Sequence, residues 1–437
     1  MTSDVVSPEQ ETLWVAQQLQ PDSAAYNVAL CFRIAEEVDS GILSKAWELL
    51  LARHEQWRAS FRLDSAGYLG LRHDGPGTPL GVRPMASLTT PEDLRRLVAD
   101  IIGEPFRLAQ AGGPCRAVLL RNEDGRDSVL VVVAHHIVTD FVTHGAMVSE
   151  LLEMYTALAL GEQPETQPPR PYTDYARDVR AMNEGAEGSA ARAYWDGVCS
   201  TLRAPVGLGL SQPDGLIAVE ATGTLEVPLP EAVHSGVRAY ARKHGTTAFV
   251  VLLAEFQRAV GAVSGQYGFA VVCPTTSRLR RHFPGTAGCF VQPVLIPGAT
   301  NVNDFEACVM ETRSQASDAL EHAGTAMTYL AGSLGGAPGD ISPLSQFAFG
   351  FQQAERAGPL LDVFAGGERH PGAVLGPLTV RAFEAAQQEG QFDLAGEVST
   401  SGVGAKLTLR YRTRGCSRSV ASEVGRTFVR HLEDALV

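Results

Sequence analysis

The chain has 437 residues, of which 45% are apolar and 19% are charged. Because a single domain usually takes about 150 residues, this length predicts at least two hydrophobic cores and excludes one small module. The 36 basic and 49 acidic side chains give a formal charge of −13, and the basic residues form no block of the kind that binds nucleic acid. We therefore expect a globular protein without a nucleic-acid partner.

The start of the chain lacks the basic and apolar regions of a secretory signal. No window reaches the roughly 18 consecutive apolar residues of a membrane span. The sequence thus predicts a cytoplasmic protein that does not act at a membrane. Its seven cysteines are scattered and include no Cys-x-x-Cys pair, which favours reduced structural thiols over a metal or redox centre.

Helical and strand-like patterns alternate along the chain, which predicts an α/β fold with two related lobes. The expected elements, in chain order, are a helix over 44–54, a hairpin around 61–67, a buried strand over 128–134, a helix over 142–155 capped by Thr139 or Asp140, a bridging helix over 172–182, a helix over 246–260 and a buried strand over 269–273. The proline-rich segment 160–172 cannot continue a helix and marks the boundary between the lobes. Glycine-rich segments at 332–339 and 365–376 are expected to be flexible loops.

The most informative motif follows the buried strand at 128–134 and reads His135-His136-Ile137-Val138-Thr139-Asp140. A rigid strand end would project an imidazole into a cleft, which suits a general base. The structural alternative is a hydrogen-bonded polar turn in which Asp140 only caps the next helix, and the motif alone does not separate the two. Metal binding fits less well, because adjacent strand residues point to opposite faces and no third ligand is near.

Further segments resemble the condensation domains of nonribosomal peptide synthetases, which belong to the chloramphenicol-acetyltransferase-like superfamily. The matching segments are 7–14, 53–61, 105–108, 135–140, 171–175, 274–278, 288–292, 342–344 and 391–394. The histidine motif alone is a weak signal, whereas this many motifs in the right order are specific. The resemblance implies an α/β fold of two acetyltransferase-like lobes in a V-shaped pseudo-dimer, which we expect at 1–175 and 176–437.

The resemblance also implies roles for the residues of the motif. His136 corresponds to the residue regarded as the general base or as the group that orients the nucleophile, and His135 corresponds to a structural histidine. Asp140 corresponds to an aspartate that points away from the cleft into an ion pair. Arg278 matches the arginine partner of that pair, which would hold the two lobes together.

The helix after Asp140 would line the tunnel through which a phosphopantetheine thioester enters, with Phe141 and Thr143 at the channel wall. The family usually has glycine directly after the aspartate, where this chain has Phe141. A bulky ring there predicts a reshaped channel, with either an unusual acceptor or lost activity as the consequence. Retention of both histidines argues against the cyclising relatives, but the epimerising relatives share the pair.

The implied reaction is acyl transfer from the phosphopantetheine thioester of an acyl or peptidyl carrier protein to an amine or hydroxyl, giving an amide or an ester. The acceptor would be a small molecule or a second carrier-bound group, and no metal or bound cofactor is implied. The chain ends predict a free-standing enzyme, with a domain excised from a larger synthetase as the alternative. Two other hypotheses remain open: a catalytically silent domain that recruits a tailoring enzyme, and an epimerisation domain.

Overall fold

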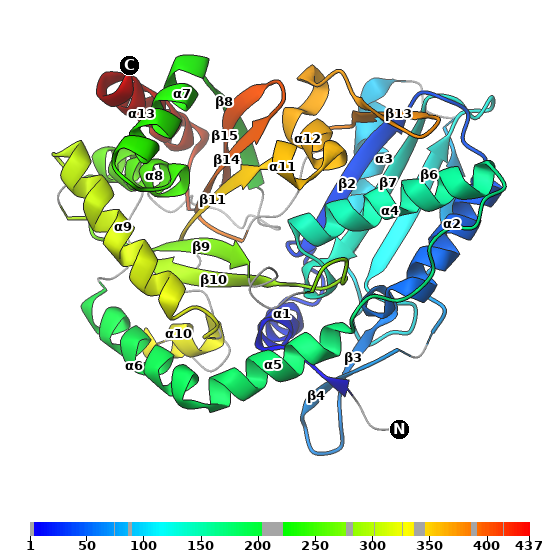
Figure 1. Ribbon diagram of the computed structural model, residues 1–437, viewed down its shortest axis with the longest axis horizontal. Helices are drawn as coiled ribbons and strands as arrows, with labels where there is room; N and C mark the ends of the chain where they lie inside the picture. Colours follow the sequence, from blue (N-terminus) through cyan, green and yellow to red (C-terminus); the bar gives the residue numbers. More distant parts are fainter. Residues whose placement is uncertain are drawn as a thin grey trace, which may run out of the picture.

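The computed structural model describes residues 4–73, 75–85, 90–202, 222–276, 283–300, 302–325, 327–335, 346–385, 391–413 and 415–437. These residues form two six-stranded sheets, one small three-stranded sheet and the helices that cover them. The two large sheets lie side by side, each with its own hydrophobic core (Figure 1). The expected two-lobed α/β fold is therefore confirmed.

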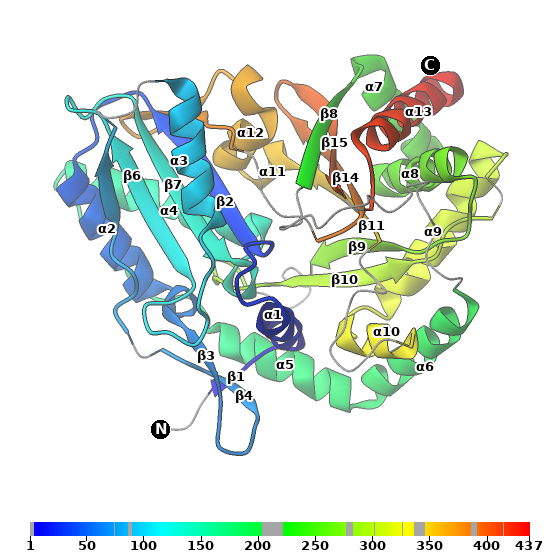
Figure 2. The same cartoon turned by 180° about the vertical axis from the view of Figure 1, so that it is seen from behind.

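The first large sheet has the strand order β12-β13-β2-β7-β6-β5. Its strands are β2 (Asn27–Ile34), β5 (Gly81–Pro84), β6 (Cys115–Arg121), β7 (Ser128–His135), β12 (Ala373–Leu375) and β13 (Leu378–Ala382). Every residue of β7 is buried, as its run of valines predicts for a strand covered on both faces. Helices α2 (Ser40–Arg53) and α4 (Phe141–Ala159) cover one face, and α3 (Pro91–Gly103) covers the other (Figures 1 and 2).

The second large sheet has the order β10-β9-β11-β14-β15-β8. Its strands are β8 (Thr222–Leu229), β9 (Val271–Thr276), β10 (Val291–Ile296), β11 (Phe347–Gln353), β14 (Leu394–Ser401) and β15 (Gly404–Arg412). Its helices are α7 (Glu231–Lys243), α8 (Ala248–Ser264), α9 (Phe305–Glu321) and α13 (Arg418–Leu436). Phe256 of α8 packs on Phe349 of β11 with ring centroids 5.0 Å apart, and Gly396 of β14 leaves the space that this packing needs.

Smaller elements complete the fold. They are β1 (Asp4–Val5), α1 (Pro8–Leu19), η1 (Glu55–Arg58), β3 (Ser60–Leu63), β4 (Leu69–Arg72), α5 (Tyr172–Glu184), α6 (Ala186–Thr201) and α10 (Met327–Ser333). Helix α1 lies between the two large sheets, and α5 runs below it toward α6, which lies on the side of the second sheet (Figures 1 and 2). The expected helices, hairpin and strands between 44 and 273 are all confirmed, within a few residues of the predicted bounds.

A crossover joins the second lobe to the first. After β11 the chain forms α11 (Ala354–Ala357), α12 (Pro359–Gly366) and η4 (Gly367–Arg369), adds β12 and β13 to the first sheet, and returns to the second sheet as β14. The prediction of a flexible loop over 365–376 is therefore wrong, because this segment is built into helix, turn and strand. Of the other expected loop, residues 336–339 lie outside the described residues. The lobe boundary at 175/176 stays a prediction. The crossover means that residues 373–382, which lie in the second half of the chain, belong to the first sheet.

All seven cysteines are buried thiols, in agreement with the predicted structural thiols. Over the described residues, no single helix is long and apolar enough to cross a membrane, although α7 and α8, bent by 114° relative to each other, reach the required length and composition as a pair.

Candidate active site

The histidine motif lies where β7 gives way to α4. Strand β7 ends at His135, a 3-10 turn η2 (His136–Val138) follows, and α4 begins after Asp140. The backbone N–H of His135 donates to the carbonyl of Pro114, and that of His136 donates to the carbonyl of Tyr26, both at 2.8 Å. The backbone of the motif is thus held by two neighbouring segments.

His135 is buried and both of its ring nitrogens are occupied. Its Nδ1 accepts a hydrogen bond from the N–H of Ile137 at 3.1 Å, so its Nε2 carries the proton and donates to Oε1 of Gln17 at 3.0 Å. Burial lowers the pKa of His135 to about 3. His135 is therefore a neutral group within the protein wall, which supports the structural role that the family resemblance implies.

Helix α1 contacts the histidine motif through two glutamine side chains. The amide of Gln10 donates to the carbonyl of Ile137 at 3.1 Å and to Oε1 of Gln56 at 3.0 Å, and all three residues are buried. Gln17, two turns later, supplies the partner of His135. Sequence reasoning missed both glutamines as site residues, although Gln10 belongs to the first matching segment.

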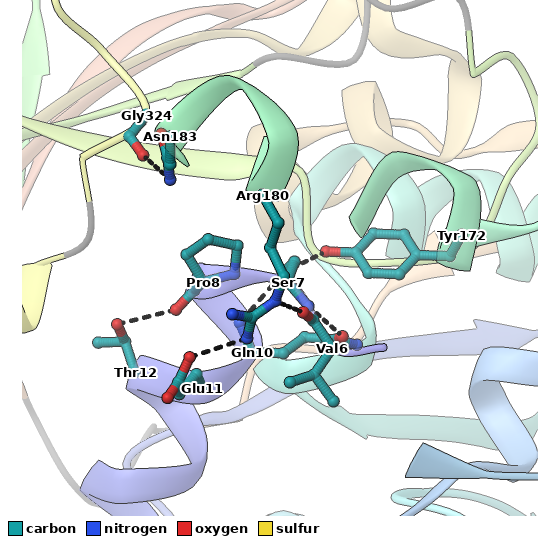
Figure 3. Close-up of polar contacts among 10 residues, drawn as sticks. All are labelled: Val6, Ser7, Pro8, Gln10, Glu11, Thr12, Tyr172, Arg180, Asn183 and Gly324. Carbon is teal, nitrogen blue, oxygen red and sulfur yellow. Dashed lines mark hydrogen bonds and ion pairs between the residues drawn. The ribbon is translucent and has the colours of Figure 1, made fainter. Parts of the chain in front are cut away.

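The start of α1 is itself fastened to α5, as Figure 3 shows. Ser7 caps α1 and its hydroxyl lies 3.0 Å from the Tyr172 hydroxyl. Arg180 donates to the carbonyl of Val6 at 2.6 Å and pairs with Glu11 at 2.9 Å. Because α5 leads from the first lobe toward the second, these bonds fix α1, and with it the motif, at the junction of the lobes.

His136 differs from its neighbour because its side chain is only half-buried. Its Nδ1 lies 3.6 Å from the sulfur of Cys289, within hydrogen-bonding distance for sulfur. A partly exposed imidazole on a rigid strand end can exchange a proton with a substrate, whereas the enclosed His135 cannot. Of the two histidines, only His136 has a partly exposed side chain, so it is the candidate for acid–base chemistry.

Asp140 is buried and uses both carboxylate oxygens. Oδ1 accepts from the N–H of Thr143 at 2.7 Å and so caps α4, as predicted. Oδ2 accepts from the N–H of Phe290 at 2.9 Å. Asp140 therefore joins the motif to the segment that leads into β10 of the second sheet. The predicted partner Arg278 lies outside the described residues, so the ion pair stays a prediction.

Phe141 and Thr143 occupy the first turn of α4 but face different neighbours. The Thr143 side chain is buried and its hydroxyl donates to the carbonyl of Gly288 at 2.8 Å. Phe141 is half-buried, and its ring packs against Phe364 of α12 with centroids 6.2 Å apart. One turn later, Gly145 makes room for Leu361 of the same helix. The role of Phe141 and Thr143 in lining a channel stays a prediction.

Residues 283–290, which we call the covering segment, pass over the motif from the second lobe. Tyr172 donates its hydroxyl to the carbonyl of Cys289 at 2.5 Å, and a side chain at Gly288 would overlap the Tyr172 ring. Phe283 and Phe290 pack with the aromatic rings of α5 in a small separate core. This segment is thus held against the motif and α5.

Comparison with known proteins identifies the class to which this fold and site belong. The family model for the condensation domain matches residues 3–437, so the chain belongs to the condensation-domain family. Chondramide synthase cmdD from Chondromyces crocatus is 28% identical over 322 residues, which cover 72% of this chain and 8% of that synthase. The chain thus spans less than a tenth of this curated relative. The homologues of the present chain are nonribosomal peptide synthetases of natural-product biosynthesis.

Solved structures show the same fold. The X-domain in its complex with OxyB from teicoplanin biosynthesis has a TM-score of 0.83 at 17% identity, covering 100% of this chain and 94% of that one. The first condensation domain of the calcium-dependent antibiotic synthetase has a TM-score of 0.77 at 19% identity, covering 99% and 95%. These similarities confirm the chloramphenicol-acetyltransferase-like fold that the sequence motifs imply.

Proposed function

We propose that this chain is an acyltransferase that moves an acyl or aminoacyl group from the phosphopantetheine thioester of a carrier protein to an amine or hydroxyl acceptor. The observation that carries this proposal is the difference between the surroundings of the two histidine side chains. His135 is buried, neutral and bonded at both nitrogens, whereas His136 is half-buried and has one ring nitrogen next to Cys289. An intact motif of this kind in a condensation-domain chain supports catalysis.

In the proposed reaction the acceptor nitrogen or oxygen attacks the thioester carbonyl carbon. The new carbon–nitrogen or carbon–oxygen bond forms as the carbon–sulfur bond breaks. The acceptor proton passes to His136 and then to the departing sulfur, so the carrier leaves with a free pantetheine thiol. Asp140 takes part only by holding the covering segment and the start of α4 in place.

The phosphopantetheine arm belongs to the carrier protein and acts as part of the substrate, so the proposal needs no cofactor resident in this chain. We propose an acyl or peptidyl carrier protein as the donor partner, and a small molecule or a second carrier as the source of the acceptor. The free-standing arrangement and the cytoplasmic location stay predictions.

A second candidate is a silent domain that recruits a tailoring enzyme. The observation that favours it is Phe141, because a ring packed on Phe364 at the start of α4 stands where the family usually has glycine. The intact motif around His136 speaks for catalysis instead. An epimerisation domain, which would use the same histidine to move an α-proton, is the third candidate.

Intact-mass analysis tests the proposal. The protein is incubated with an acyl-loaded carrier and a panel of amines and alcohols, with His136→Ala as the matched control. Loss of the acyl mass from the carrier together with a new acylated acceptor, seen with the wild type and not with the variant, supports acyl transfer. No product with any donor and acceptor contradicts it and favours recruitment. Solvent deuterium at the α-carbon of a loaded aminoacyl carrier, without a new bond, indicates epimerisation.

A further inference from the structure

Three consecutive residues of the covering segment are each fastened by a hydrogen bond to the first lobe or to α5. The carbonyl of Gly288 accepts from the Thr143 hydroxyl at 2.8 Å. The carbonyl of Cys289 accepts from the Tyr172 hydroxyl at 2.5 Å, and the N–H of Phe290 donates to Asp140 at 2.9 Å. The backbone around Cys289 therefore has little freedom to move.

This fixed backbone places the Cys289 side chain against the imidazole of His136. The sulfur lies 3.6 Å from Nδ1, and Cys289 is only 2% exposed. Nδ1 of His136 thus faces the protein wall. Of the two ring nitrogens, this leaves Nε2 as the one available to a substrate.

A neutral imidazole carries one proton, so the partner of Nδ1 decides what Nε2 can do. If Nδ1 holds the proton and donates to the sulfur, Nε2 keeps a lone pair and can accept a proton. If instead the thiol donates to Nδ1, Nε2 holds the proton and can only donate it. A thiol is both a weak donor and a weak acceptor, so either arrangement is chemically possible.

We propose that Cys289 is a positioning residue that accepts a hydrogen bond from Nδ1–H of His136 and so keeps the Nε2 lone pair directed to the acceptor. The choice of this proton arrangement rests on the proposed acyl transfer, which requires a base. Unlike the carboxylate that orients histidine in many enzymes, a neutral thiol adds no charge to the site. Asp140 and Thr143 act one step further away, because they fasten the residues on either side of Cys289.

Nuclear magnetic resonance of the protein labelled with ¹³C-histidine tests the proton arrangement without any substrate. The Cδ2 shift of a histidine reports its tautomer, and His136→Gln identifies the His136 signal. We expect the Nδ1–H form in the wild type and a mixture of both tautomers in Cys289→Ala. Cys199→Ala serves as the control, because this buried thiol lies near the carbonyl of Leu330 instead. An Nε2–H form in the wild type, or an unchanged signal in Cys289→Ala, would overturn the proposal.

Kinetics then test the consequence for the reaction. We expect Cys289→Ala to lower kcat roughly 10- to 100-fold with KM little changed, because a misplaced catalytic group slows chemistry more than binding. Cys289→Ser, which keeps a hydrogen-bonding group, should recover part of the rate. Equal losses in the Ser and Ala variants would show that the thiol only fills space. The wild-type spectrum decides the tautomer even if the variants fold poorly. If the wild type shows the Nδ1–H form but catalyses no acyl transfer, the proposed function is refuted and the proposed tautomer is not.

Discussion

Asp140 accepts a hydrogen bond from the backbone N–H of Phe290, 150 residues later in the chain and 2.9 Å from its Oδ2. The other carboxylate oxygen caps α4 through the N–H of Thr143. One buried side chain therefore both starts the helix behind the motif and holds the covering segment over it. Its removal affects local and long-range structure together.

Asp140→Ala is expected to lower the free energy of unfolding by roughly 2–4 kcal/mol, since it loses a helix cap and a charge-assisted hydrogen bond between the lobes. Urea denaturation gives the measurement. Asp304→Ala is the matched control, because Asp304 caps α9 through the N–H of Ala307 and its side chain is exposed there. That control should lose only about 1 kcal/mol. Equal losses in the two variants would show that the bond to Phe290 adds nothing.

His136→Ala should abolish condensation and leave the fold intact, because a half-buried side chain contributes little packing. General acid–base assistance is typically worth about 10²–10⁴-fold in rate. His135→Ala is expected to affect stability more than catalysis. It removes two buried hydrogen bonds and should lower the unfolding midpoint. Turnover and thermal unfolding of both variants provide the check, and near-normal turnover in His136→Ala would rule out the base.

Phe141→Gly is expected to change which acceptors react, while donor use stays similar. A hydrophobic wall discriminates by about 1–3 kcal/mol for a small change in apolar size. Competition between paired amines and alcohols gives the preference. Val142→Gly is the matched control, because this exposed neighbour shares the first turn of α4 and the cost of glycine in a helix. If Phe141→Gly keeps the wild-type preference, the ring only packs against Phe364.

The same competition reveals the type of acceptor. A hydroxyl is a weak nucleophile until a base removes its proton, whereas a neutral amine already has a free lone pair. Loss of His136 should therefore slow ester formation more than amide formation. An equal loss with both acceptors would indicate that His136 orients the nucleophile and does not act as a base.

Stability should fall in mild acid because two buried histidines resist protonation. Burial lowers the pKa of His135 to about 3 and that of His144 to about 4, against about 6.5 in the unfolded chain. Between pH 6.5 and these values the unfolded state binds more protons, so the free energy of unfolding decreases as the pH falls through this window. Urea midpoints at pH 7 and pH 5 measure the change. The decrease should be smaller in His144→Gln, and identical decreases would refute the assignment.

The sequence predicted the local part of the site well. The valine run of β7, the turn at His135 and the cap at Asp140 are encoded within about 15 neighbouring residues, so periodicity and capping rules find them. The contact between His136 and Cys289 is different, because it joins residues 153 apart. No local pattern specifies such a pair until the path of the covering segment is known.

The error at 365–376 has a physical cause. Glycine in a loop allows flexibility, but it also allows close approach of neighbouring atoms. Gly367 has a φ of 62° and leaves room for the Glu384 carboxylate. Gly372 has a φ of 103°, and a side chain there would lie 2.7 Å from the carbonyl of Val380. These glycines permit tight packing of an ordered crossover, and composition alone does not distinguish the two uses.

The crossover also affects the order in which the two lobes can fold during synthesis. Strand β2 pairs with β13 through residues 32–34 and 380–382, so the first sheet lacks its neighbours on that side until the ribosome has passed residue 382. During most of synthesis the nascent chain would expose an unpaired edge of a hydrophobic sheet, which is a template for wrong association. The amino-terminal lobe is therefore started first but completed late, and its folding depends on sequence encoded in the other half of the chain.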